Sequence, residues 1–312
     1  MKKGNTLGID TSNYTTSAAL YWEDKSITHS KRLLPVKEGQ LGLRQSDAVF
    51  HHVQQLPQIL EPLIRQQPVL RAIGASSRPR CAEGSYMPCF SVGFGTAKIL
   101  ADTLGIPLYP CSHQENHIAA ALYSADRLEL MGQTFLAFHV SGGTTEAVLV
   151  EPDAEHLIRT RLLASSLDLK GGQAVDRVGV MLGLSFPAGP ELERLALQSV
   201  AKFKIHPSMR GCDCSLSGIE NQCRTMFDKG APKEEIARFC LLSLLAALDA
   251  MCGALLQEYG DLPVLFAGGV MSNSMIRQAL TQRYGASFAK PEFSADNAAG
   301  AAILAAIKEE AI

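Results

Sequence analysis

Residues 7–20 read LGIDTSNYTTSAAL and residues 137–150 read AFHVSGGTTEAVLV, two stretches whose parts follow the same order. In each, a short apolar run leads into a turn of small hydroxyl and glycine residues, and a second apolar run follows. The pattern predicts two strand–turn–strand hairpins. Such turns leave backbone N–H groups and hydroxyls free to hold phosphate, so two hairpins facing each other would clamp one nucleotide. Ordinary β-turns use the same residues and remain the alternative.

A third glycine turn, residues 268–273, follows the apolar run 264–267 and precedes a helical stretch, residues 274–280. Close backbone approach at the glycines and the positive end of the helix together suit a nucleotide base, ribose or phosphate. Taken alone, the arrangement is also a common α/β connection. A fourth patch combines residues 171–177 with the rigid turn 186–190, and the acid within it could equally serve as a structural cap.

Strand-like runs and helical stretches alternate along the chain, which predicts an α/β protein. The strand-like runs are residues 6–10, 72–76, 135–140, 147–150 and 264–267. Helical spacing marks residues 91–104, which end before Gly105, and residues 236–256, a very apolar stretch expected to be buried between layers. With 312 residues, 46% hydrophobic and 19% charged, the chain can bury a sizeable core and suits two domains or one bilobed domain.

The formal net charge of -2 neither supports nor excludes RNA binding, which would have to use local basic patches at residues 31–32 or 78–80. No run of about 18 apolar residues and no signal peptide is evident, so we expect a cytoplasmic protein without a membrane span. Eight scattered cysteines fit reduced thiols in that compartment. Cys212, Cys214 and Cys223 lack the usual metal-binding spacing and are interpreted as adventitious.

The segment His113-Gln114-Glu115-Asn116-His117 places two histidines four residues apart. On a helix they project to the same face and can bind one metal ion, with Asp296 available as a distant oxygen ligand. A zinc-protease function is not expected, because Glu115 is turned roughly 200° away from His113 instead of directly following it. Histidine pairs of this spacing also occur on ordinary helix surfaces, so the spacing alone leaves both interpretations open.

In this order, these residues resemble the TsaD family, also called Gcp or YgjD and formerly labelled O-sialoglycoprotein endopeptidase. The resemblance covers nearly the whole chain, and the combination is specific although each piece is not. It rests on residues 8–12, 93–97, 104–107, 140–143 and 187–190, on His113, His117 and Asp176, and on residues 215–218, 267–270, Asn273 and 296–299.

The resemblance implies an actin-like ATPase (ASKHA) fold, with two RNase H-like lobes and a nucleotide cleft between them. The lobes would be residues 1–128 and 129–312, with the terminal helix packing back on the first lobe. The implied activity is transfer of a threonylcarbamoyl group from threonylcarbamoyl-AMP to the adenosine beside the anticodon of tRNA. The implied partners are tRNA and TsaB-like and TsaE-like proteins, in a homodimer or heterodimer.

The resemblance also implies a set of site residues. One divalent metal, iron or zinc with magnesium or manganese as alternatives, would be held by His113, His117 and Asp296. ATP or an AMP-containing adenylate would be held by Ser12, Ser141, Gly142, Gly143, Asp176, Gly189, Gly268, Gly269 and Asn273. A mixed carbamic-phosphoric anhydride is already activated, so such an enzyme needs a Lewis acid and positioning, not a serine or cysteine nucleophile.

The chain departs from the family pattern at five positions. Tyr14 and Thr15 stand where two acids are usual, and neither replaces a carboxylate at neutral pH. Gln173 replaces a glutamate, Ala188 replaces the first glycine of a Pro-Gly-Gly-Pro turn, and Glu220 replaces a lysine. The departures indicate a divergent paralogue and leave two alternatives, a carbamoyl or acyl transferase with a non-tRNA acceptor, or a nucleotide-binding regulatory paralogue. Retention of the metal residues argues against the second.

Overall fold

The hairpin predicted at residues 7–20 begins a five-stranded sheet. In the computed structural model, which describes residues 4–12, 14–35 and 43–311, strands β1 (Asn5–Ser12) and β2 (Thr15–Tyr21) are antiparallel. This hairpin is therefore confirmed, although Asn13 at its tip lies outside the described residues. The sheet also contains β3 (Ile27–Leu33), β4 (Leu70–Arg78) and β5 (Leu108–Ser112), in the order β3-β2-β1-β4-β5. Strand β4 runs parallel to both β1 and β5.

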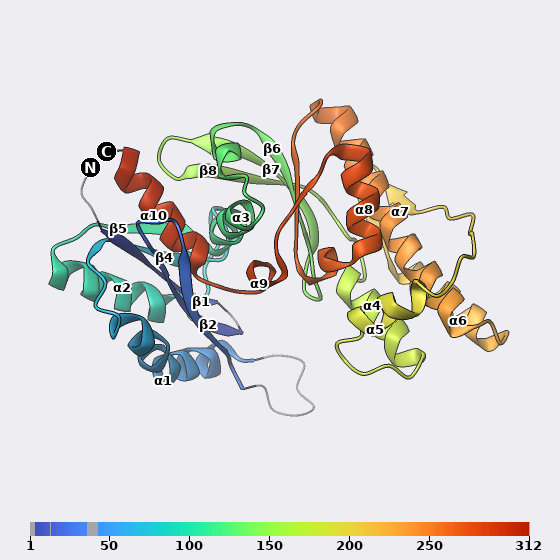
Figure 1. Cartoon of the computed structure of the whole chain (residues 1–312), viewed down its shortest axis with the longest axis horizontal. Coiled ribbons are helices and arrows are strands. Elements are labelled where there is room, and N and C mark those ends of the chain that lie inside the picture. Colours follow the sequence, from blue (N-terminus) through green and yellow to red (C-terminus); the bar gives the residue numbers. More distant parts are fainter. Residues whose placement is uncertain (1–3, 13, 36–42, 312) are drawn as a thin grey trace. The chain divides into compact units, whose positions relative to one another are not determined.

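Helices pack against both faces of this sheet (Figure 1). Leu7 and Ile9 of β1 pack with residues of α1 (Gln45–Ile64) and α2 (Phe90–Leu104). Gly8 lies between them and faces the other way, because side chains alternate along a strand. On that face lies α10 (Ala299–Ala311), which also packs against α3 (His113–Ser124).

Glycines let the backbone of the last helix approach the sheet closely. A Cβ atom on Gly8 would lie 2.2 Å from the carbonyl oxygen of Ala298, and one on Gly74 of β4 would lie 1.9 Å from that of Ala301. Gly300 has the same constraint, since its Cβ would lie 1.8 Å from the carbonyl oxygen of Asn116. These contacts make the C-terminal segment part of the core around β1 and β4.

The chain forms two compact units, and each unit is made of segments that are not consecutive in the sequence. Unit 1 comprises residues 1–131, 152–160 and 292–312, and unit 2 comprises residues 132–151 and 161–291. The short helix α9 (Pro291–Ser294) belongs to unit 1 except for its first residue. The chain passes from unit 1 into unit 2 at the end of a 3₁₀ helix, η1 (Leu128–Gly132). The C-terminal helix α10 thus belongs to the same unit as the first strand.

Unit 2 is built on a second five-stranded sheet, in the order β12-β11-β6-β7-β8. Its strands are β6 (Phe135–Val140), β7 (Thr145–Asp153), β8 (Leu157–Ser165), β11 (Val264–Ala267) and β12 (Ser287–Phe288), with the first residues of β8 and the end of β7 assigned to unit 1. The other elements are α4 (Gly171–Met181), α5 (Gly189–Ala196), β9 (Ser208–Arg210), β10 (Asp213–Ser215), α6 (Ser217–Asp228), α7 (Lys233–Tyr259), η2 (Gly269–Ser272) and α8 (Ser274–Tyr284). The second predicted hairpin, β6–β7, is antiparallel and is confirmed.

Helix α7 is the long apolar helix expected at residues 236–256, and it is buried in the core of unit 2 through side chains such as Leu244, Leu248 and Met251. By length and composition it could cross a membrane, with 56% of its apolar window buried. The expectation that no stretch is long and apolar enough for this test was therefore wrong. A helix that serves a core on several sides loses the polar face that would distinguish it from a membrane span.

The other strands and helices expected from periodicity are also confirmed. Residues 6–10, 72–76, 135–140, 147–150 and 264–267 all lie within strands, and residues 91–104 lie within α2. Gly105 follows α2 in the left-handed conformation, with φ at 63°, which explains why the helix ends there. The α/β class follows from these elements.

Candidate metal centre

Helix α3 positions the two histidines of the predicted metal site. It begins with a capping box, in which the Ser112 hydroxyl accepts from the backbone N–H of Glu115 at 3.2 Å and the Glu115 carboxylate accepts from the N–H of Ser112 at 2.5 Å. Glu115 is therefore buried, and its carboxylate caps the start of the helix. It is turned away from the histidines, as its position in the sequence predicts. The Nε2 atoms of His113 and His117 lie 3.0 Å apart.

Asp296 is the third residue that the structure brings to this point. Its Oδ1 atom lies 3.2 Å from His117 Nε2 and 3.6 Å from His113 Nε2. Ligand atoms bound to one ion at about 2.1 Å are separated by about 3.0 Å in an octahedral site and about 3.4 Å in a tetrahedral one. The three separations therefore fit a single metal ion, and the donor set of two imidazoles and a carboxylate suits zinc, iron or manganese.

Asp10, at the end of β1, lies behind the histidines and is fully buried. Its Oδ2 atom is 2.8 Å from His113 Nδ1 and accepts from the Asn116 amide at 3.3 Å, while Oδ1 accepts from the N–H of Ser12 at 3.1 Å. A carboxylate in this position selects the imidazole tautomer with a proton on Nδ1 and leaves Nε2 free to bind a metal. The Nε2 of His113 is the atom that faces Asp296.

The charges at this point favour a cation. Burial lowers the pKa of His113, but the carboxylates of Asp10 and Asp296 outweigh it and raise that pKa to about 10. Burial raises the pKa of Asp10, and His113 more than offsets this, so its pKa lies below the ordinary value. Asp296 shows the same balance more strongly, because hydrogen bonds from His113 and His117 hold its pKa well below the usual range despite burial. Two ionised carboxylates thus face two imidazoles.

Asn116 connects this cluster to the C-terminal segment that carries Asp296. Its amide donates to the carbonyl oxygen of Asn297 at 2.6 Å, and its side-chain oxygen accepts from the N–H of Ala301 at 2.8 Å. Sequence reasoning assigned no role to Asp10 or Asn116. In the sequence, Asp10 is a carboxylate near the end of an apolar run and Asn116 is an amide between the two histidines. Neither has a spacing to its partners that would indicate its role.

Thr15, one of the departures from the family pattern, also reaches this cluster. It lies at the start of β2, is 4% exposed, and donates from its hydroxyl to Asp296 Oδ2 at 3.1 Å. Tyr14 is 41% exposed. The two positions where acids are usual therefore have different environments, and only position 15 is hydrogen-bonded to the centre in the described part of the chain.

Ser12 is the nucleotide-site candidate in unit 1, and the other candidates lie in unit 2. The Ser12 side chain is 3% exposed, and its hydroxyl has no hydrogen-bond partner among the described residues. In unit 2, the tip of the β6–β7 hairpin is closed by the N–H of Ser141, which donates to the carbonyl of Thr144 at 2.7 Å. The Ser141 hydroxyl accepts from the N–H groups of Gly143 and Thr144, at 3.3 and 3.1 Å.

The hairpin tip packs on the first turn of α4 and against the third glycine turn. A Cβ atom on Gly172 would lie 2.6 Å from the backbone nitrogen of Gly142, and one on Gly268 would lie 2.2 Å from the carbonyl oxygen of Val140. Gly268 has a φ of 101°, which side-chain-bearing residues rarely adopt. The structure thus brings Gly142 and Gly268 to the same end of β6. Gly269 follows as the first residue of η2.

The remaining candidates have structural hydrogen bonds. Asn273 caps α8, since its side-chain oxygen accepts from the N–H of Ile276 at 3.1 Å. Asp176 of α4 accepts from the N–H of Ala188 at 2.8 Å, immediately before Gly189 begins α5. One of the two carboxylate oxygens of Asp176 therefore acts as a structural cap, which was the alternative expected for this acid.

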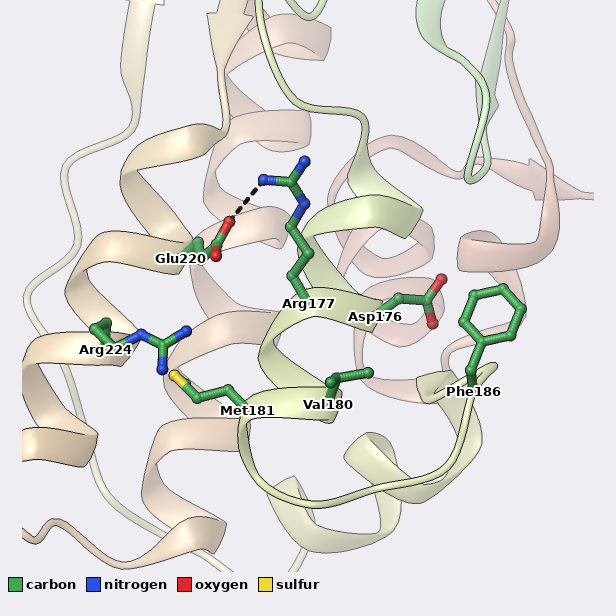
Figure 2. Close-up of a pocket in the computed structure, with 7 residues that line it drawn as sticks. All are labelled: Asp176, Arg177, Val180, Met181, Phe186, Glu220 and Arg224. Carbon is green, nitrogen blue, oxygen red and sulfur yellow. Dashed lines mark hydrogen bonds and ion pairs between the residues drawn. The ribbon is translucent and has the colours of Figure 1, made fainter. Parts of the chain in front are cut away.

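Asp176 also borders a pocket of about 650 Å³ in unit 2 (Figure 2). The pocket combines apolar side chains with charged ones, and Phe186 on its rim is 77% exposed. Its lining residues are Asp176, Arg177, Val180, Met181, Phe186, Glu220 and Arg224. Within it, Arg177 and Glu220 form an ion pair at 3.0 Å, so the negative charge at position 220 is compensated.

The two other departures are accommodated locally. Gln173 accepts from the backbone N–H of Lys170 at 3.3 Å, a hydrogen bond that a glutamate carboxylate could also accept. Ala188 is fully buried and has ordinary helical angles, with φ at -82°. Its methyl group fills space that a Cβ on Gly179 would need, since that atom would lie 2.1 Å away.

Known proteins resemble this chain in sequence over most of its length. The profile of the family described as "TsaD: tRNA N6-adenosine threonylcarbamoyltransferase" matches residues 29–303. A tRNA N6-adenosine threonylcarbamoyltransferase of Thermus thermophilus is 30% identical over 279 residues, covering 87% of this chain and 82% of that protein. The enzyme of that name from Vesicomyosocius okutanii is 30% identical over 310 residues, covering 94% and 87%.

Among solved structures, HypF of T. kodakarensis is similar over 98% of this chain and 47% of that one, with a TM-score of 0.62 and 13% sequence identity. At this identity the likeness concerns the fold, which is that of the actin-like ATPases. The fold expected from the resemblance is therefore confirmed. Since both the profile and the relatives cover most of the chain, it belongs to the TsaD family of tRNA N6-adenosine threonylcarbamoyltransferases.

Proposed function

We propose that this protein transfers a threonylcarbamoyl group from threonylcarbamoyl-AMP to the adenosine beside the anticodon of tRNA, with one divalent metal held by His113, His117 and Asp296. The observation that carries the proposal is the convergence of these three ligand atoms within 4.8 Å of one another. A buried carboxylate, Asp10, orients the first histidine as the ligands of functional metal sites are commonly oriented. Iron or zinc fits this donor set best, with manganese or magnesium as alternatives.

The reaction needs positioning more than covalent help from the protein. The exocyclic amine of adenosine attacks the carbamoyl carbon, a C–N bond forms, the bond from that carbon to the phosphate oxygen breaks, and AMP leaves with the bonding electrons. The amine nitrogen gives up one proton. A divalent ion at the centre would supply a Lewis acid for the acyl or phosphate oxygens. The side chains at the centre hold its ligand atoms in place before substrate arrives.

Within unit 2, the adenylate would be held by the glycine turns. Gly142, Gly143, Gly268 and Gly269 permit close approach of backbone to phosphate, and a Cβ added at Gly142 or Gly143 would meet no described atom within 4 Å. The pocket beside Asp176 offers space for the nucleoside. Gly189 and Asn273 are the remaining candidates for holding the adenylate. On this proposal the partners are tRNA and TsaB-like and TsaE-like proteins, and the protein is cytoplasmic.

A second candidate function is transfer of the same kind of group to an acceptor other than tRNA. It is favoured by Thr15, because a neutral hydroxyl bonded to Asp296 stands where the family usually has an acid at the centre. Without that acid, the acceptor amine would lose one carboxylate that could accept its proton.

A transfer assay separates the candidates. The purified protein, with TsaB-like and TsaE-like partners from the same cell, is given threonylcarbamoyl-AMP labelled in the threonine and tRNA that lacks the modification. We expect label in tRNA, and its loss in His113→Ala together with loss of bound metal. Label on another acceptor from a fractionated extract would support the second candidate. Consumption of the adenylate with no labelled acceptor, or metal content unchanged by His113→Ala, would contradict the proposal.

A further inference from the structure

We propose that Thr15 is a positioning residue of the metal centre, whose hydroxyl holds the Asp296 carboxylate so that one oxygen faces the two histidines. The inference rests on the metal site of the proposed function and adds a residue to it. It also assigns a purpose to one of the two positions where the family usually has acids, by a contact that the described structure contains.

The geometry divides the two oxygens of Asp296 between two tasks. Oδ2 accepts from the Thr15 hydroxyl at 3.1 Å, and Oδ1 lies 3.2 Å from His117 Nε2 and 3.6 Å from His113 Nε2. A carboxylate can rotate about its last bond, and a hydrogen bond to one oxygen restricts that rotation. With Oδ2 held, Oδ1 is left on the side where the ion would lie.

Asp296 depends on this contact because its own backbone gives little support to the carboxylate. The residue lies between α9 and α10, outside both helices. The hydrogen bonds that fix this connection are made by the neighbouring Asn297, whose amide donates to Phe293 and Ala295 carbonyls at 3.2 and 2.8 Å. In the described part of the chain, Thr15 makes the hydrogen bond to Oδ2, and its own burial at the start of β2 fixes where the hydroxyl is.

The neutrality of Thr15 matters as well as its hydroxyl. Asp10 and Asp296 already place two carboxylates at the centre, 2.8 Å from His113 Nδ1 and 3.2 Å from His117 Nε2. A third carboxylate at position 15 would face Asp296 at hydrogen-bond distance, and like charges this close disfavour one another. A hydroxyl can hold the carboxylate without that repulsion.

Metal affinity tests the proposal without depending on catalysis. The full-length protein is stripped of metal and titrated with Zn²⁺ against a coloured chelator, and Co²⁺ absorption reports the ligand geometry. Thr15→Val removes the hydroxyl and keeps the shape of the side chain. We expect Zn²⁺ to bind about 10-fold to 100-fold more weakly, the usual effect of losing a residue that orients a ligand, with an altered Co²⁺ spectrum. Thr15→Ser keeps the hydroxyl and should restore most of the affinity.

Thr16→Val is the matched control. Thr16 is also buried on β2, but its hydroxyl is bonded to His52 and Gln55, at 2.8 and 2.9 Å. This variant should lose thermal stability and keep its Zn²⁺ affinity. Equal affinity in wild type and Thr15→Val, or an equal loss in Thr16→Val, would overturn the role of Thr15. Failure of the wild-type protein to bind Zn²⁺ or Co²⁺ would instead remove the metal centre on which the proposed function depends.

Discussion

Asp10 gathers three hydrogen bonds on one buried carboxylate, from Ser12, His113 and Asn116. The histidine spacing was visible in the sequence because positions four apart share a helix face, and this relation is local. Asp10 was not visible, because an acid at the end of a strand has no spacing to its partner, which is 103 residues away in the chain. At this scale the sequence indicated the proposed metal ligands and left out Asp10, which contacts the first of them.

Asp168 is a second carboxylate whose role appears only in the folded chain. Its oxygens accept from the backbone N–H of Leu216 at 2.7 Å and from the Ser217 hydroxyl at 2.5 Å, where α6 begins. Burial raises its pKa, but these hydrogen bonds and one from the N–H of Leu169 bring that pKa below the ordinary value. The ionised form of Asp168 therefore supports the start of α6, as a capping residue does.

We expect Asp168→Asn to lower the free energy of unfolding by about 1–2 kcal/mol at pH 7. A lowered pKa means that the stabilisation is complete above the unfolded-state pKa of about 3.9 and is lost as the pH falls through the lower folded value. The difference between wild type and variant should therefore shrink below about pH 4. Urea unfolding at a series of pH values measures it, with Asp261→Asn as the control. A difference that does not vary with pH would contradict this account.

At the scale of elements, the packing of α10 on β1 and β4 depends on the absence of side chains. Gly8 and Gly74 both face this helix, and a Cβ on either would meet its backbone or the residue just before it. Backbone cannot move aside as a flexible side chain can, so even one methyl group would separate the layers. Strand periodicity predicted β1 and β4, but it did not indicate which helix would cover them.

Gly74→Ala should destabilise the protein by about 3 kcal/mol or more, because overpacking against backbone exceeds the usual cost of an added methyl in a core. The control is Gly95→Ala in α2, where a Cβ would meet nothing within 4 Å. That change should stabilise by about 0.5–1 kcal/mol, since alanine is the better helix former. Urea unfolding followed by circular dichroism measures both. If Gly74→Ala proved as harmless as Gly95→Ala, the close approach of α10 would be wrong.

At the scale of the whole molecule, unit 1 takes its segments from both ends of the chain. The single tryptophan, Trp22, lies in this unit and packs at the edge of the core formed by β1, α1 and α2. Its fluorescence therefore reports unit 1 alone, whereas far-ultraviolet circular dichroism reports the helices of both units.

A chain that ends after Pro291 lacks the 292–312 segment and leaves the α10 face of the unit 1 sheet uncovered. We expect it to lose the cooperative transition of Trp22 fluorescence while circular dichroism still shows a transition from unit 2, whose segments remain complete. The full-length Asp296→Asn variant is the control, because it changes a proposed metal ligand and keeps α10, and it should retain both transitions. A normal Trp22 transition in the truncated chain would show that unit 1 does not need its C-terminal segment.

The sequence by itself determined the two hairpins, the apolar helix α7 and the pairing of His113 with His117, because each is set by the spacing of residues close together in the chain. Tertiary structure decided what lies beside them. Asp296 meets the histidines and Thr15 because the C-terminal segment returns to β1, and the packing of α10 there depends on glycines that let two backbones approach closely. Local periodicity encodes elements, whereas contacts between distant segments depend on which surfaces fit.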